Sequence, residues 1–277
     1  MTNTLLDLVQ KSGQWLVGKG VENGRREAEW IFGEALGLTR LELYTRYDMP
    51  LDAAETDRLR ALIARRGRRE PLAYVLGNQE FHSLRLTVTP AVLVPRPETE
   101  ALVDLVLAGL PAGASAVLDV GTGSGAIALA LKHARPELLV QARDISAEAL
   151  AVASGNADRL ALAVSFSRGH LAQGLDGPFA AVVANLPYIA EDERSLCDPE
   201  LAFEPAAALF PGGDGLGLIR ELIADAPRLL ATDGALWLEH GFRQAAPIAA
   251  AASARGLRCI LHRDAAGLDR ISEVRRA

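Results

Sequence analysis

From Ala116 to the C-terminus, short apolar segments alternate with longer amphipathic segments. The apolar segments have the length of buried strands, and most of the intervals between them can hold a helix. Such alternation is typical of a mostly parallel sheet covered by helices on both faces. Strands are expected at residues 116–120, 138–144, 163–167, 180–184, 235–239 and 257–261, with another near 270–274.

The first 75 residues have a helical pattern instead. Apolar side chains recur at roughly helical spacing in residues 5–16, where Thr4 and Asp7 resemble a capping box. Helical spacing and terminal signals predict two more helices at residues 25–36 and 53–66. This part of the chain is therefore expected to form a small helical bundle.

A change of pattern separates the two parts. Residues 79–94 carry alternating apolar side chains that predict extended structure in the form of a hairpin, and residues 98–110 predict a helix after a proline-rich break. We therefore expect an N-terminal helical domain at residues 1–75, a hairpin linker at residues 76–95 and an α/β domain at residues 96–277.

Composition excludes several classes of protein. With 49% hydrophobic residues the chain is an ordinary globular protein, and it has no apolar run of the roughly 20 residues that a membrane span needs. Its two cysteines, Cys197 and Cys259, are far apart, which argues against a disulfide framework and fits the cytoplasm. Residues 1–85 carry a net charge of +1 and residues 86–277 one of −7, so neither part is a polybasic nucleic-acid binder.

The densest positive cluster comprises Arg65, Arg66, Arg68 and Arg69. Two interpretations are open. The cluster is either a solvated helix end or a docking patch for an acidic or RNA-associated partner.

A glycine-rich turn follows the first strand of the α/β part. Glycines let the backbone turn sharply and approach a ligand closely, and the helix that begins there offers unpaired N–H groups to an anion. The residues expected to line this ligand site are Gly121, Thr122, Gly123, Ser124 and Gly125.

A carboxylate at the end of the next strand supports a nucleotide-type ligand. Asp144 can accept hydrogen bonds from the ribose hydroxyls of an adenosine. Two cofactors remain open on these residues. S-adenosylmethionine is favoured over NAD, although Gly121, Gly123 and Ala126 also satisfy the dinucleotide pattern.

Asn185, Leu186, Pro187 and Tyr188 directly follow the apolar strand at residues 180–184. Open α/β sheets bind ligands at the carboxyl ends of their strands. There the Asn185 side-chain oxygen and the Leu186 carbonyl can accept the two N–H groups of a planar amide or amino nitrogen, while Tyr188 packs on its face. These acceptors would hold the nitrogen near a sulfonium methyl group.

Several segments together resemble the release factor glutamine methyltransferase family. The resemblance runs nearly end to end and is carried by residues 69–77, 93–100, 185–188, 203–205 and 239–241, and by Asp264, Asp269 and Arg270. Such ordered motifs are far more specific than a glycine loop alone.

The resemblance implies a Rossmann-like class I methyltransferase domain, whose seven-stranded, mostly parallel sheet has one antiparallel strand at its edge. It implies methyl transfer from S-adenosylmethionine to the glutamine side-chain nitrogen of the Gly-Gly-Gln motif in class 1 peptide-chain release factors. Asn185, Leu186, Pro187 and Tyr188 would then be the catalytic residues, and Asn185 would also contact the cofactor. The helical domain would recognise the release factor. The protein is expected to be a monomer that needs no membrane, metal or stable nucleic acid.

Two positions depart from the family pattern. The family tetrad has proline where this chain has Leu186, which keeps the carbonyl but loses the fixed φ of proline. We expect a slower enzyme. The family also has an acidic residue near His170, where His170 and Leu171 would contact the cofactor; alternatively, His170 is a solvent-facing loop residue. Glu239, at a strand end, is expected either to support the loop that holds Asn185 or to have a structural role.

Three rival functions remain open. A nucleic-acid adenine methyltransferase uses a similar tetrad, but it normally needs a basic groove for phosphates. A binding protein that keeps the cofactor but has lost turnover would be explained by Leu186 and His170. An NAD-dependent oxidoreductase fits the glycine loop and leaves the tetrad unexplained.

Overall fold

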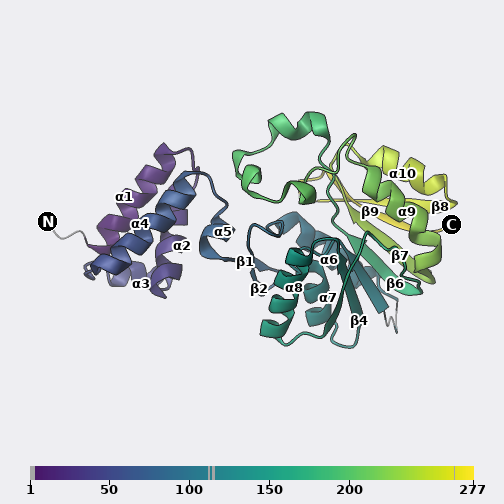
Figure 1. Ribbon diagram of the computed structural model, residues 1–277, viewed down its shortest axis with the longest axis horizontal. Coiled ribbons are helices and arrows are strands. Elements are labelled where there is room, and N and C mark those ends of the chain that lie inside the picture. The colour runs from purple at the N-terminus through teal and green to yellow at the C-terminus, as the bar shows by residue number, and fades with distance from the viewer. Residues whose placement is uncertain (1–3, 112, 114–115, 265) are drawn as a thin grey trace. The chain divides into compact units, whose positions relative to one another are not determined.

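The computed structural model describes residues 4–111, 113, 116–264 and 266–277, which belong to two compact units (Figure 1). The helical unit comprises the described residues up to Gly77 together with Asp198–Phe203. The α/β unit comprises Asn78–Cys197 and the described residues from Glu204 onwards. Residues 1–3 of the expected helical domain lie outside the described residues.

The helical unit is built from five α-helices in its described part: α1 (Leu5–Gly18), α2 (Gly24–Leu36), α3 (Arg40–Thr45), α4 (Ala53–Gly67) and α5 (Leu72–Leu76). The Thr4 hydroxyl accepts a hydrogen bond from the Asp7 N–H, and Asp52 forms a reciprocal capping box with Glu55. Two helices, α3 and α5, were not predicted, because five or six residues are too few to show a helical period.

The arginine cluster of the helical unit contains one buried side chain, that of Arg66, and one exposed side chain, that of Arg68. Arg66 is only 4% exposed and pairs with Glu27 and, at 2.8 Å, with Glu200. Arg69 lies 3.1 Å from Asp198 and 3.2 Å from Glu200. The prediction of a solvated helix end is therefore wrong for Arg66, because its acidic partners lie far away in the sequence. The cluster holds the 3₁₀ turn Pro199–Phe203 in the helical unit.

The α/β unit begins with a hairpin and continues with alternating helices and strands. Its hairpin consists of β1 (Asn78–Phe81) and β2 (Leu84–Thr87). The strands of the main sheet are β3 (Ala116–Val120), β4 (Leu139–Asp144), β5 (Val164–Arg168), β6 (Phe179–Ala184), β7 (Leu230–Glu239), β8 (Leu257–Arg263) and β9 (Asp269–Arg276). The helices are α6 (Pro97–Gly109), α7 (Ala126–Ala134), α8 (Ala147–Leu160), α9 (Gly217–Leu229) and α10 (Ala245–Ser253), with short 3₁₀ turns at Glu191–Leu196 and Ala206–Ala208.

The main sheet has the strand order β5-β4-β3-β6-β7-β9-β8, which confirms a seven-stranded, mostly parallel sheet. β9 forms antiparallel pairs with both β7 and β8 and therefore lies between them. The expectation of an antiparallel edge strand is wrong. The reason is that β8 is parallel to the other strands and occupies the edge, and the short connection after it brings β9 back into the remaining place.

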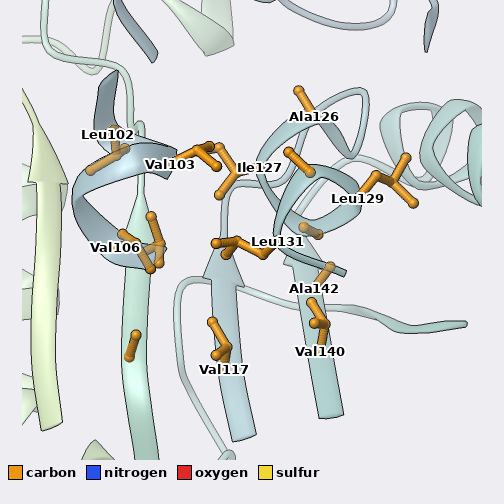
Figure 2. Close-up of a cluster of buried hydrophobic side chains, with 14 of the residues drawn as sticks. Leu102, Val103, Val106, Val117, Ala126, Ile127, Leu129, Leu131, Val140 and Ala142 are labelled. Carbon is orange, nitrogen blue, oxygen red and sulfur yellow. The ribbon is translucent and has the colours of Figure 1, made fainter. Parts of the chain in front are cut away.

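Side chains that alternate along the strands fill two separate cores. Val117, Val140 and Ala142 point to the face that α6 and α7 cover, where Figure 2 shows them below Leu102 and Val106. The neighbouring side chains, such as Leu118 and Val182, point to the face covered by α9 and α10. The sheet is therefore buried on both faces, as the near-continuous apolar character of its strands predicts. No helix in the described ranges is both long and apolar enough to cross a bilayer.

The chain leaves the sheet centre in two directions. From β3 it proceeds outward through β4 and β5, and it then returns to place β6 on the other side of β3. The point between β3 and β6 is a topological switch point, where open α/β sheets bind their ligands beyond the carboxyl ends of the strands.

We predict that Arg66→Ala destabilises the protein, because it removes a buried cation and leaves Glu27 and Glu200 without it. Breaking a buried ion pair in this way costs roughly 3–5 kcal/mol. Urea unfolding monitored by circular dichroism tests this, with Arg68→Ala as the matched control, because Arg68 is exposed. Equal stability of the two variants would contradict the structural role of Arg66.

Candidate active site

The register between β3 and β6 brings two predicted loops side by side. Val120, the last residue of β3, pairs with Ala184, the last residue of β6. The glycine loop and the Asn185 loop therefore leave the sheet at neighbouring positions. A Cβ atom at Gly121 would lie 4.0 Å from the Asn185 carbonyl oxygen and 3.0 Å from Leu186 Cδ2.

The glycine loop has a backbone that favours glycine. Gly121 and Gly123 have φ angles of +75° and +55°. A Cβ atom at Gly123 would meet no atom within 4 Å, so the space above this part of the loop is open. Helix α7 begins next to this space, and its N-terminal N–H groups favour a negatively charged group there.

Asp144 fixes the glycine loop from the neighbouring strand. Its Oδ2 accepts a hydrogen bond of 2.9 Å from the Gly123 N–H, and its Oδ1 accepts one of the same length from the Ser146 N–H. Each carboxylate oxygen can accept more than one hydrogen bond, so Asp144 can also receive ribose hydroxyls. The Asp144 carboxylate therefore both holds the loop and borders the space for a ligand.

Beneath the loop lies a second carboxyl group, that of Asp119. One of its oxygens accepts hydrogen bonds from the Thr122 hydroxyl at 2.6 Å and from the Ala128 N–H at 3.1 Å. The other oxygen has no partner among the described residues. Burial raises the pKa of Asp119 to about 7, and the nearby Asp144 carboxylate contributes to the increase.

A cavity of about 260 Å³ lies over both loops. Every predicted site residue except Gly125 and Tyr188 lines it. Those lining residues are Gly121, Thr122, Gly123, Ser124, Asp144, His170, Leu171, Asn185, Leu186 and Pro187. Gly125 instead forms the N-cap of α7 with a φ of +84°, and Tyr188 packs against the core under α9.

His170 and Leu171 reach the cavity from the end of β5. The His170 Nε2 lies 3.0 Å from a carboxylate oxygen of Glu221, to which a neutral imidazole must donate. Nδ1 then remains as an acceptor. Leu171 is buried and has a φ of +41°, which is uncommon for a leucine.

Asn185 is held by a chain of hydrogen bonds that leads to Glu239, which agrees with one of the two roles expected for Glu239; the link through Thr99 was not predicted. Its Nδ2 donates to the Thr99 hydroxyl oxygen at 3.0 Å. Thr99 in turn donates to Glu239 Oε2 at 2.7 Å, and the Tyr188 hydroxyl lies 3.5 Å from the other oxygen of Glu239. Burial raises the pKa of both Glu239 and Tyr188, while the hydrogen bond from Thr99 and the charge of Arg270 partly offset the increase at Glu239.

Two acceptors of the tetrad remain available. Neither the Asn185 side-chain oxygen nor the Leu186 carbonyl accepts a hydrogen bond from any group in the described part of the chain. Both residues line the cavity. This pair of acceptors can therefore bind a planar N–H₂ group.

The loop after the tetrad is fixed by residues with no predicted role. The Gln244 amide donates to the Tyr188 carbonyl at 2.8 Å. Glu204 accepts from the Val94 N–H at 2.9 Å and pairs with Arg96, which joins two of the resemblance motifs. The motifs signalled that these segments matter, but only the fold shows which residues meet.

The residues of the cavity fit S-adenosylmethionine by their chemistry. A side chain at Gly123 would occupy the space above the loop, Asp144 suits ribose hydroxyls, and the α7 N-terminus suits a carboxylate. In the described ranges no group of three or more His, Cys, Asp or Glu side chains is arranged to hold a metal ion.

Comparisons with known proteins agree with this arrangement. The PrmC N-terminal domain model matches residues 7–77, and the methyltransferase small domain model matches residues 99–216. A release factor glutamine methyltransferase from Geobacter sulfurreducens is 42% identical over 93% of this chain and 91% of its own length. One from Deinococcus radiodurans is 39% identical over 99% of both chains.

A solved methyltransferase from Pyrococcus furiosus has a similar fold. It matches with a TM-score of 0.53 and 19% identity over 69% of this chain and 87% of its own. At that identity the likeness supports the methyltransferase fold alone.

We predict that stability depends on pH through Asp119. Because its folded pKa, about 7, exceeds the ordinary aspartate value of 3.8, its stabilising contribution is complete below pH 3.8 and is lost as the pH rises through about 7. The loss amounts to about 4 kcal/mol. Asp119→Asn keeps the acceptor for Thr122 and Ala128 but cannot ionise. Urea unfolding from pH 4 to 8 should show a wild-type decline that this variant lacks; parallel curves would contradict the prediction.

Proposed function

The chain belongs to the release factor glutamine methyltransferase family, and from this premise we propose its reaction and substrate. The proposed reaction transfers a methyl group from S-adenosylmethionine to the side-chain amide nitrogen of the glutamine in the Gly-Gly-Gln motif of class 1 release factors. The observation that carries the proposal is the pair of available acceptors on Asn185 and Leu186 beside the glycine-loop cavity.

The residues of the glycine loop and Asp144 would hold the cofactor. S-adenosylmethionine supplies a methyl carbon bonded to a positively charged sulfur, and this carbon accepts a nucleophile. Gly121, Gly123 and Gly125 shape the loop, and Asp144, which already accepts from the Gly123 N–H, would receive the ribose hydroxyls. His170 and Leu171 complete the wall at the end of β5.

Asn185 and Leu186 would orient the substrate amide. An amide nitrogen is a poor nucleophile because its lone pair is delocalised, so orientation and removal of water carry much of the catalysis. Well-oriented reactants can remove roughly 7–11 kcal/mol of barrier. Pro187 lines the same cavity, whereas Tyr188 lies outside its lining and packs against the core under α9, so its ring is not assigned to the face of the amide.

The same two acceptors would favour the transition state. As the nitrogen bonded to the methyl carbon, the carbon–sulfur bond would break with its electron pair going to sulfur, and the positive charge that developed on the nitrogen would make its N–H groups stronger donors. The oxygens of Asn185 and Leu186 then bind these N–H groups more tightly than in the ground state. One N–H proton can leave after the methyl transfer, so the site needs no strong general base.

The substrate would be recognised beyond its glutamine. One side chain offers too little surface for specificity, so we propose that the helical unit, with boundaries near the predicted 1–75, contributes to binding the release factor. We further propose that the protein acts as a monomer in the cytoplasm and needs no stable nucleic acid.

The decisive experiment measures methyl transfer from labelled S-adenosylmethionine to a purified class 1 release factor, with the modified residue mapped by mass spectrometry. Label on the Gly-Gly-Gln glutamine is the expected result. Cofactor binding without transfer would favour the binding-only alternative. Transfer to adenine in a nucleic acid instead would favour the adenine methyltransferase.

We predict that Asn185→Ala abolishes methyl transfer and leaves affinity for S-adenosylmethionine nearly unchanged, because Asn185 acts chiefly on the substrate amide. Transfer assays and isothermal titration calorimetry measure the two effects separately. Full activity of the variant would refute the assigned mechanism.

We predict that Leu186→Pro raises the turnover number, because proline fixes the φ angle that presents the carbonyl oxygen. The Leu186 side chain is only 4% exposed and belongs to the core cluster under α9. Its loss should therefore lower stability by roughly 1–3 kcal/mol. Single-turnover kinetics and urea unfolding test the two parts, and an unchanged or lower rate would count against preorganisation by the ring.

A further inference from the structure

A buried carboxylate lies behind the substrate-binding asparagine. Glu239 is 2% exposed and ends β7, directly beside β6. Among the described residues it forms no ion pair with an arginine or lysine within 4.0 Å. Burying a carboxylate costs several kcal/mol unless its oxygens are satisfied. The oxygens of Glu239 face two hydroxyl groups, those of Thr99 and Tyr188.

The hydroxyl of Thr99 connects this carboxylate to the side-chain amide of Asn185. A threonine hydroxyl has one hydrogen, and the Thr99 hydroxyl donates it to Glu239 Oε2. The 2.7 Å contact with Glu239 therefore uses the hydrogen of Thr99. Toward Asn185, 3.0 Å away, the Thr99 oxygen can then only accept. The Thr99 oxygen therefore binds the NH₂ group of the Asn185 amide and not its oxygen.

We infer that Thr99 and Glu239 are positioning residues that fix the Asn185 amide with its oxygen toward the substrate. This inference rests on the proposed function. An Asn side chain turned by 180° would present NH₂ to the substrate N–H₂ group, and two donors would face each other. The hydrogen-bond chain excludes that orientation before the substrate binds.

Three separate elements contribute to this hydrogen-bond chain. Thr99 lies in the first turn of α6, Glu239 ends β7 and Asn185 follows β6. Thr99 is 4% exposed, so water does not compete for its hydroxyl. The other groups that influence Glu239 are Tyr188, Glu98 and Arg270.

The kinetic test compares Thr99→Val with Thr99→Ser. Valine has nearly the shape of threonine but no hydroxyl, so the Asn185 amide loses its orientation. We expect kcat to fall roughly 10- to 100-fold, as misplacement of a reacting group does, with little change in KM for S-adenosylmethionine. Serine keeps the hydroxyl and should restore kcat to within a few-fold of wild type.

A matched control removes a buried hydroxyl elsewhere. Ser272 is buried and lies 2.8 Å from His240 Nε2, outside the chain that reaches Asn185. Ser272→Ala should leave kcat within about twofold of wild type. Wild-type kcat in Thr99→Val, or failure of serine to restore it, would overturn the inference. The inference would also be overturned if the loss of kcat in Thr99→Val were accompanied by proportionate losses of cofactor affinity and melting temperature.

A second readout does not depend on activity. In the NMR spectrum of the protein, the two Asn185 side-chain N–H signals should be well separated, because one of them donates to Thr99. In Thr99→Val the chemical shifts of the two signals should become more similar, and in Thr99→Ser the signals should remain well separated. Unchanged signals in Thr99→Val would overturn the inference. An inactive wild-type protein with this NMR pattern would refute the proposed function and retain the assigned amide orientation.

Discussion

Parallel pairing of β3 with β6 is the constraint on which the candidate site depends. Because Val120 pairs with Ala184, the glycine loop and the Asn185 loop leave the sheet at adjacent points. A shift of one residue in this register would exchange the two faces of β6 and carry Asn185 away from the cavity. The apolar side chains on both faces resist such a shift, since they fill two separate cores. Packing of the sheet therefore also fixes the distance between cofactor and substrate groups.

Buried acidic groups lie directly below this edge of the sheet. Asp119 supports the glycine loop through Thr122, and Glu239 supports Asn185 through Thr99. In both cases a threonine hydroxyl connects a costly buried carboxyl group to a loop residue. Burial removes water as a competitor, so each hydroxyl has a defined donor direction. Desolvation of these carboxyl groups is unfavourable, but the buried groups hold the two loops in defined conformations.

The sequence predicted what depends on local pattern and missed what depends on topology. The main-sheet strands were predicted because each is a short apolar run, but β7 starts at Leu230 rather than at residue 235, because polar residues interrupt its pattern. The contact between Asn185 and Thr99 joins residues 86 positions apart, so no local pattern reveals it. The burial of Arg66 likewise depends on Glu200, which is 134 positions away. The place of β9 required the whole strand order.

Leu186 illustrates how packing can compensate in part for a departure from a family motif. A proline would restrict the backbone directly through its ring. Leu186 instead places its side chain in the core cluster that also contains Leu118 and Val120 of β3. Its Cδ2 lies so close to Gly121 that a side chain there would meet it at 3.0 Å. This contact restrains the substrate loop, and together with the φ of +75° at Gly121 it favours glycine at that position of the cofactor loop.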